Sequence, residues 1–173
     1  MVQGSRSAAA MDSLAGIYNR AGFVALVNRE LVRAGSGDDE PHSAVRLLDV
    51  DDLKFVNQHY GNESADLLLQ TFAQELRAIA GDSDVCARIG GGAFALFLGG
   101  VEGDAATRDA FSEARGALVA AAHRTLGAGS QLTLKAGAVS QRSRDERATE
   151  MLARADDALA KSQCSDDCEL TIG

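Results

Sequence analysis

The residues of this chain that could do chemistry begin with two carboxylates at the end of a short apolar segment. Asp49 and Asp51 follow the run Val45–Leu48 at positions i and i+2, so on a strand both side chains lie on one face. Paired carboxylates at a strand end can hold a divalent cation, and the backbone N–H groups of Asp52–Lys54 would point at a bound phosphate. The pair taken alone fits better with a solvated strand end whose aspartate caps the next helix.

Two further features could read a nucleotide. Asn57 and Asp66 flank a turn at Gly61, and an amide with a carboxylate matches the N1–H and N2–H₂ edge of guanine. Each residue alone is also typical of a helix cap or a polar surface position. The triplet Gly90–Gly92 permits close approach of the backbone to a ligand, or serves only as a hairpin turn that needs positive φ.

The composition narrows the classes of function. The formal net charge is −8 and the arginines are scattered, which disfavours binding to duplex nucleic acid or to an anionic membrane. No run of about 18 apolar residues and no secretory signal occurs. Three cysteines, Cys86, Cys164 and Cys168, then indicate a reducing cytoplasm, and Cys164 and Cys168 fit incidental thiols better than a metal pair. We expect no nucleic-acid partner and no membrane segment in this chain, while a parent protein could be membrane-anchored.

Hydrophobic periodicity predicts the elements that position these residues. Phe23, Val27 and Leu31 recur at helical spacing, and Gly90–Gly92 joins two short apolar segments as a β-hairpin. The expected helices cover 12–33, 52–60, 63–80, 104–124 and 147–163, and the expected strands cover 44–51, 84–89, 93–98 and 132–139. A hairpin among helices implies a mixed sheet rather than a doubly wound parallel one. We expect an α+β sandwich whose central, largely antiparallel sheet is flanked by helices.

The length of 173 residues fits one domain. Residues 1–10 are expected to be a linker or a remnant of a neighbouring segment. Residues 11–173 are expected to form a single domain excised from a longer multidomain protein. The polar break at 35–41, which holds the chain's one proline, fits a loop rather than a domain boundary.

Four segments, taken in order, resemble the motifs of GGDEF domains, the diguanylate cyclase family. Residues 12–20, DSLAGIYNR, resemble the opening motif D-x-L-T-G-L-x-N-R, and residues 49–66 resemble D-x-D-x-F-K-x-x-N-D-x-x-G-H-x-x-G-D. Residues 88–94, RIGGGAF, align with R-x-G-G-D/E-E-F, and residues 155–159, ADDAL, resemble A-D-x-A-L of the last helix. Order and spacing agree over nearly the whole chain, from about residue 12 to residue 168.

The resemblance implies a palm-like fold related to nucleotidyl cyclases and polymerases. Active members of the family condense two GTP molecules into cyclic di-GMP. Each of two protomers holds one GTP, and the 3′-hydroxyl of one attacks the α-phosphate of the other. Divalent metals hold the triphosphate and stabilise the developing charge. A homodimer is therefore the implied assembly. For this chain we expect no required cofactor, with Mg²⁺ accompanying GTP where GTP binds.

The chain departs from the family where the chemistry lies. Gly92 stands at the position of a metal-binding Asp or Glu, and Ala93 at that of the Glu tied to catalysis. Asp49, with the Val50 carbonyl, is then a weak metal site, because a cation held by one carboxylate binds poorly. Loss of acid–base assistance alone costs about 10²–10⁴ in rate.

Two more family sites have changed. In the last helix Gln163 aligns with the family's Lys, and Asp167 aligns with its phosphate-binding Arg, where an anion would repel a triphosphate. In the product-inhibition motif R-x-x-D the Asp is kept as Asp84, but Gly81 replaces the Arg. Without that guanidinium, bidentate recognition is lost, and we do not expect cyclic di-GMP to bind there.

The remaining positions match a nucleotide pocket with milder changes at Leu53, Asn62 and Ala65. By the resemblance, the candidate nucleotide-binding residues are Asp49, Val50, Leu53, Lys54, Asn57, Asp66, Gly90 and Gly91. We expect a catalytically degenerate regulatory module of bacterial cyclic di-GMP signalling, without cyclase activity, that regulates an adjacent EAL-type phosphodiesterase or receptor domain. Two alternatives stay open: a GTP-binding allosteric sensor, and a domain with residual diguanylate cyclase activity.

Overall fold

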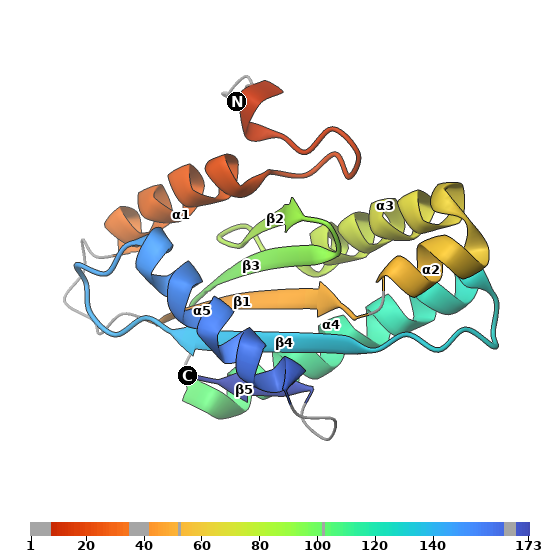
Figure 1. Ribbon diagram of the computed structural model, residues 1–173. Helices are drawn as coiled ribbons and strands as arrows, with labels where there is room; N and C mark the ends of the chain where they lie inside the picture. Colours follow the sequence, from red (N-terminus) through yellow and green to blue (C-terminus); the bar gives the residue numbers. More distant parts are fainter. Residues whose placement is uncertain (1–7, 35–41, 52, 102, 165–168) are drawn as a thin grey trace.

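The computed structural model describes residues 8–34, 42–51, 53–101, 103–164 and 169–173. A five-stranded sheet in the order β2-β3-β1-β4-β5 forms the centre, and helices cover both faces (Figure 1). The elements are η1 (Ala8–Ala10), α1 (Arg20–Ala34), β1 (Ser43–Val50), α2 (Leu53–Tyr60), α3 (Asn62–Ile79), β2 (Val85–Gly90), β3 (Ala93–Gly99), α4 (Gly103–Leu126), β4 (Leu134–Ser140), α5 (Ala148–Gln163) and β5 (Leu170–Ile172).

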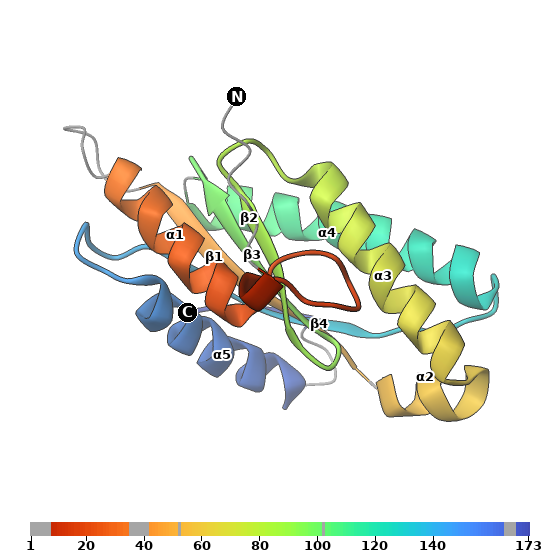
Figure 2. The same cartoon turned by 90° about the horizontal axis from the view of Figure 1, so that it is seen from above.

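Strand β1 lies in the middle of the sheet and is antiparallel to both β3 and β4. β2 is antiparallel to β3, and only β5 pairs in parallel, with β4. Figure 2 shows α1 and α5 on one side of the strands and α3 and α4 on the other. The expected α+β architecture with a mixed, largely antiparallel sheet is therefore confirmed.

The alternation of side chains along β1 feeds two separate cores. Val45 and Leu47 pack with α1 and α5, whereas Leu48 and Val50 pack with α3 and α4. A strand buried on both faces needs apolar residues at successive positions, which is why its sequence pattern is nearly continuous rather than alternating. Among the described residues, none of the helices has both the length and the apolar character that a bilayer-spanning segment requires.

The expected helix over 12–33 is wrong at its start, because α1 begins at Arg20. The Asp12 carboxylate accepts the backbone N–H groups of Leu14 and Ala15, at 3.2 and 2.7 Å, and so holds this segment in a turn. Asn19 then accepts the Gly22 N–H at 3.0 Å and caps the helix. Short polar side chains that bond to the local backbone compete with helix formation, and here they win.

The segment before α1, residues 8–19, forms a strap across the outer edge of β2. Its Tyr18 forms a parallel bridge with Ala87, and the Arg88 N–H donates to the Tyr18 carbonyl at 2.8 Å. The Asn19 amide also donates to the Ala9 carbonyl at 2.8 Å, which ties η1 to the start of α1. The strap therefore covers backbone groups that an edge strand would otherwise expose.

Helix α5 lies unusually close to β4 because Gly137 has no side chain. A Cβ atom at this position would lie 2.2 Å from both the Ala155 carbonyl oxygen and the Leu159 nitrogen. Direct contact of the helix backbone with the strand fixes the height and direction of α5 over the sheet. This contact determines where the last turn of α5 ends.

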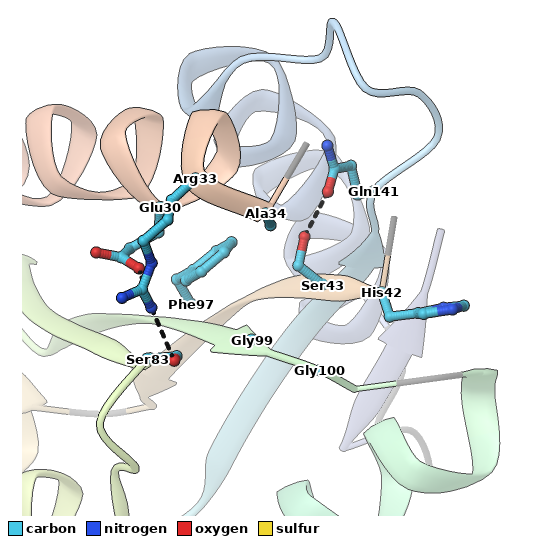
Figure 3. A pocket seen from close by; sticks show the side chains of 10 residues that line it. All are labelled: Glu30, Arg33, Ala34, His42, Ser43, Ser83, Phe97, Gly99, Gly100 and Gln141. Carbon is cyan, nitrogen blue, oxygen red and sulfur yellow. Dashed lines mark hydrogen bonds and ion pairs between the residues drawn. The ribbon is translucent and has the colours of Figure 1, made fainter. Parts of the chain in front are cut away.

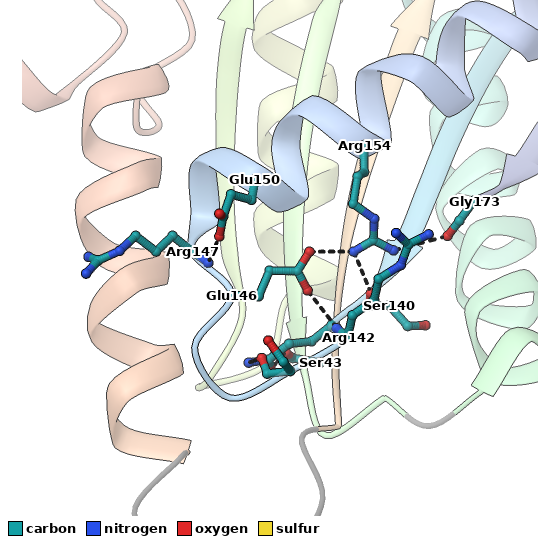
Figure 4. A network of polar contacts seen from close by, with 10 residues as sticks. Ser43, Ser140, Arg142, Glu146, Arg147, Glu150, Arg154 and Gly173 are labelled. Atoms are coloured by element: carbon teal, nitrogen blue, oxygen red, sulfur yellow. Dashed lines mark hydrogen bonds and ion pairs between the residues drawn. The ribbon is translucent and has the colours of Figure 1, made fainter.

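A polar network fastens the middle of α5 (Figure 4). The Arg154 guanidinium pairs with Glu146 at 2.6 Å and donates to the carbonyls of Ser140 and Gly173, at 3.1 and 3.3 Å. The second carboxylate oxygen of Glu146 accepts the Arg142 N–H at 2.6 Å. The Arg154 guanidinium thus joins α5, the end of β4 and the residue that follows β5. The sequence pattern did not predict β5.

Replacing Arg154 with Met should loosen β5. The change leaves the Glu146 carboxylate, whose side chain is only 8% exposed, without its cation. We expect a loss of about 2 kcal/mol in unfolding free energy and faster hydrogen exchange at residues 171–173. Exchange mass spectrometry against Arg108→Met, an exposed arginine on α4, tests this. Unchanged exchange at β5 would show that strand pairing alone holds it.

Arg46 is a buried charge in the middle of β1. Its side chain is 1% exposed, and its Nη2 donates to the Thr107 carbonyl at 2.9 Å, while its Nε has no hydrogen-bond partner. Burial lowers the pKa of the Arg46 guanidinium to about 10, against an opposing attraction from Asp84. The shift from 12.5 corresponds to a cost of about 3 kcal/mol for carrying this charge in the folded state.

Arg46→Met should therefore raise the unfolding free energy by about 1 kcal/mol, because it keeps the aliphatic stem and removes the buried charge. Arg46→Lys keeps the charge on a shorter reach and should lower stability. Urea denaturation of both variants provides the measurement. A loss of stability in Arg46→Met would mean that the hydrogen bond to Thr107 and the attraction of Asp84 outweigh desolvation.

Candidate functional site

The candidate site lies at the end of the sheet where β1 stops and the β2–β3 turn begins. Strand register places four residues in one row: Gly90 opposite Ala93, Ala93 opposite Asp49, and Asp49 opposite Lys135. Paired positions on neighbouring strands lie on one face, about 5 Å apart at their Cβ atoms. The row therefore holds one carboxylate, with a methyl group on one side and a lysine on the other.

Gln163, the last residue of α5, reaches the carboxylate of this row. Its Nε2 donates to the Asp49 Oδ2 at 2.8 Å. Burial raises the pKa of Asp49, and the negative charge of Asp51 raises it further, while hydrogen bonds from Gln163 and from the Val50 backbone oppose the rise. Asp49 and Asp51 thus lie close enough to repel, as their spacing predicts, and Gln163 provides a neutral donor to the pair.

The glycine turn is pressed against the end of β1. Gly90 and Gly91 have φ values of 150° and 54°, which glycine adopts without strain. Gly92 has no such requirement, but it is buried, and a Cβ there would lie 3.0 Å from the Val50 Cβ. The Val50 N–H also donates to the Gly92 carbonyl at 3.1 Å. The glycine turn therefore packs directly against the end of β1 through Gly92.

One guanidinium joins this turn to the opening motif. Arg88 donates through Nε to the Gly91 carbonyl at 2.9 Å and through Nη1 to both Asp12 carboxylate oxygens, at 3.2 and 3.1 Å. Sequence reasoning matched both motifs but did not connect them. An Arg just before a Gly-rich turn, with an Asp in a distant motif, was the available signal.

The residues expected to read a base lie on two helices that pack against each other. Asn57 lies on α2 and donates through Nδ2 to the Leu53 carbonyl at 2.9 Å, and Asp66 is exposed on α3. Gly61, at φ 85°, forms the sharp turn between them. Lys54 is exposed on α2, whereas Leu53 packs against the core. The Asn57 amide oxygen and the Asp66 carboxylate are the groups that a ligand could meet.

Asp84, the residue kept from the inhibition motif, serves the backbone. Its two carboxylate oxygens accept the N–H groups of Gly81 and Gly99, at 2.8 and 2.9 Å. It also lines a cavity of about 170 Å³ between α3, β2 and the strap, together with Arg77. Arg77 precedes Gly81 by one helical turn, so a guanidinium borders this cavity from a position the motif does not predict.

A larger cavity, of about 260 Å³, lies at the opposite end of the sheet (Figure 3). Its polar groups pair with each other: Arg33 with Glu30 at 2.8 Å and with Ser83 at 3.1 Å, and Ser43 with Gln141 at 2.6 Å. It contains none of the residues expected to bind a nucleotide. We therefore take the row around Asp49, not this cavity, as the candidate site.

The residues present do not fit the divalent metals of active cyclases. Within the described part of the chain, no three side chains among His, Cys, Asp and Glu gather as a metal ion would need. Gly92 and Ala93 offer no side-chain oxygen, and the Asp49 carboxylate is already bonded. Asp52, Asp167 and Cys168 lie outside the described residues; Cys86 is buried and Cys164 is exposed.

Gly92→Ala should lower the unfolding free energy by about 1 kcal/mol, because the added Cβ meets the Val50 Cβ at 3.0 Å. Ala93→Ser, one residue along, adds a similar volume at a half-buried position and should change stability by less than about 0.5 kcal/mol. Urea denaturation compares the two variants. Equal stability of Gly92→Ala and the parent would show that the turn moves away from β1 without cost.

Comparison with known proteins shows the family of this chain. The family model "Diguanylate cyclase, GGDEF domain" matches residues 9–167. Probable diguanylate cyclase DgcF of Escherichia coli (strain K12) is 36% identical over 85 residues, which cover 49% of this chain and 25% of that protein. Diguanylate cyclase DgcP of Pseudomonas aeruginosa is 28% identical over 162 residues, or 94% of this chain and 24% of the relative. The chain thus spans about a quarter of the length of these relatives.

Solved structures show the same fold. The coiled coil and GGDEF domain of DgcB from Caulobacter crescentus, in complex with c-di-GMP, superposes with a TM-score of 0.79 at 24% identity, covering 95% of this chain and 86% of that chain. The S helix-GGDEF-EAL portion of Vibrio cholerae LapD, bound to c-di-GMP, gives 0.74 at 19% identity, covering 97% of this chain and 37% of that chain. With a family match across residues 9–167, this chain belongs to the diguanylate cyclase GGDEF domain family.

Proposed function

We propose that this GGDEF domain is a non-catalytic regulatory module of cyclic di-GMP signalling in the bacterial cytoplasm. The observation that carries the proposal is the row at the end of the sheet, in which Asp49 is flanked in register by Ala93 and Lys135. Joining two GTP molecules requires charge stabilisation at the attacked phosphate and removal of a proton from the attacking hydroxyl. A methyl group at position 93 can do neither.

The output of such a module is the activity of a neighbouring domain. LapD combines a GGDEF domain with an EAL domain, and the relative named MucR is described as a bifunctional diguanylate cyclase and cyclic di-GMP phosphodiesterase. These arrangements support an EAL-type phosphodiesterase or receptor domain as the partner in a longer protein. The domain would then act through its contacts with that partner, and it requires no cofactor of its own.

A second function, as a GTP-binding allosteric sensor, is favoured by α2 and α3. The Asn57 amide bonds to the Leu53 carbonyl through its nitrogen and not through its oxygen, and the Asp66 carboxylate is exposed on the adjacent helix. Together they offer an acceptor pair for a guanine edge. For GTP to regulate a partner domain, its affinity would have to differ between two domain arrangements. Residual cyclase activity remains the third alternative, and GTP turnover distinguishes it.

The deciding experiment combines turnover and binding. The purified domain is incubated with GTP and Mg²⁺ or Mn²⁺, and nucleotides are separated chromatographically; we expect no cyclic di-GMP after several hours. Product that disappears in Asp49→Ala would overturn the proposal in favour of a cyclase.

Isothermal titration with GTP separates the regulatory module from the sensor. No binding up to millimolar GTP supports a module that works through protein contacts. Micromolar binding that is lost in Asp66→Ala but kept in Glu63→Ala, an exposed carboxylate one turn earlier on α3, would establish the sensor instead.

A further inference from the structure

We propose that Gln163 takes the place of a cation at Asp49. Its amide forms a neutral clamp that closes the last turn of α5 onto the end of β1. The contact joins residues 114 positions apart, from Gln163 Nε2 to Asp49 Oδ2 at 2.8 Å. The inference rests on the proposed non-catalytic function and states how this site is kept in a metal-free form.

The surroundings of Asp49 disfavour a bound cation. The register neighbour on one side is Ala93, which has no ligand atom, and on the other it is Lys135, which is 4% exposed. Neither neighbour therefore adds an oxygen ligand, and a cation here would be held by few groups. Asp49 and Asp51 repel each other, and the Gln163 amide donates to Asp49 without adding a charge.

The fold directs Gln163 to this point. Because Gly137 lets the α5 backbone lie directly on β4, the direction of the helix is set by main-chain contact rather than by adaptable side chains. The Gln163 side chain leaves the last residue of that helix beside the end of β1. An amide at this position meets a carboxylate without any rearrangement, so the clamp is part of the folded state.

Two substitutions distinguish a hydrogen-bonded clamp at Asp49 from a metal site at the same carboxylate. Asp49→Asn keeps an oxygen that accepts the Gln163 N–H and removes the repulsion from Asp51, so a clamp tolerates it, whereas a metal ligand would be lost. Gln163→Glu puts a third carboxylate against Asp49 and Asp51. A cation bound among the three carboxylates would relieve their mutual repulsion.

The experiment measures thermal unfolding and Mn²⁺ binding, without nucleotide, in EDTA and in millimolar MnCl₂. We expect the parent domain to unfold at the same temperature in both and to bind no Mn²⁺ by electron paramagnetic resonance. Asp49→Asn should match the parent. Gln163→Glu should unfold several degrees lower in EDTA and recover in Mn²⁺, whereas Gln74→Glu, exposed on α3, should do neither.

Stabilisation of the parent by Mn²⁺ that disappears in Asp49→Asn would overturn the clamp, as would a Gln163→Glu variant insensitive to EDTA. If Gln163→Glu does not fold, Gln163→Met removes the donor at similar length. Hydrogen exchange at residues 162–164 should then rise at least tenfold, and an unchanged rate would refute the clamp. These assays contain no GTP, so a result that refutes the clamp says nothing about cyclase activity. Formation of cyclic di-GMP in the turnover assay would instead refute the non-catalytic function and leave the clamp untouched.

Discussion

The arrangement of this domain depends on the contact of the α5 backbone with β4 at Gly137. Because Gly137 has no side chain, α5 lies directly on β4. Three consequences follow from this short distance between the helix and the sheet. Met151, Leu152 and Ala155 reach the core formed with α1, the Arg154 guanidinium reaches the carbonyls of Ser140 and Gly173, and Gln163 ends beside Asp49. Two kinds of polar contact thus secure α5: the charged, multiply bonded Arg154 in its middle and the neutral, singly bonded Gln163 at its end. The candidate site is in this sense a product of helix packing as much as of the residues in its own row.

A second constraint is that charged groups removed from water need a compensating partner. The chain is acidic overall, yet the described guanidinium groups that matter most are at least partly buried: Arg46, Arg88 and Arg154. Arg88 and Arg154 each meet a carboxylate and a backbone carbonyl, so their charge is compensated and they hold loops that have little apolar content of their own. Arg46 donates to the Thr107 carbonyl, and the attraction of Asp84 does not offset burial, so the affinity of the guanidinium for its proton falls. Arginine therefore stabilises the loops that Arg88 and Arg154 contact, whereas the buried charge of Arg46 lowers the stability of β1.

Much of the fold could be predicted from the sequence, since strands β1 to β4 and helices α2 to α5 follow from apolar periodicity and the glycine turn. The start of α1 could not, because the pattern does not show that Asp12 and Asn19 bond to the nearby backbone instead of continuing a helix. β5 was missed because three residues are too few for a periodic signal, and its parallel pairing with β4 is set by tertiary structure. At the site, the motifs identified Asp49, Ala93 and Gln163 separately. Only the folded chain brings them together, because register and helix direction decide which side chains meet. The ion pair between Arg88 and Asp12 could have been predicted, because each residue belongs to one of the family motifs, 76 positions apart in the sequence.

The strap of residues 8–19 has a consequence for how copies of this domain can meet. In the described structure, Tyr18 bridges the outer strand β2, and the opposite border of the sheet is the three-residue strand β5. Unpaired strand borders are the usual starting points for sheet-to-sheet growth and amyloid-like aggregation. Here one border is partly capped by the chain itself and the other is too short to template a new strand. Pairing between copies through these two sheet borders is therefore disfavoured in the described structure, and a contact between copies would use helices and loops instead.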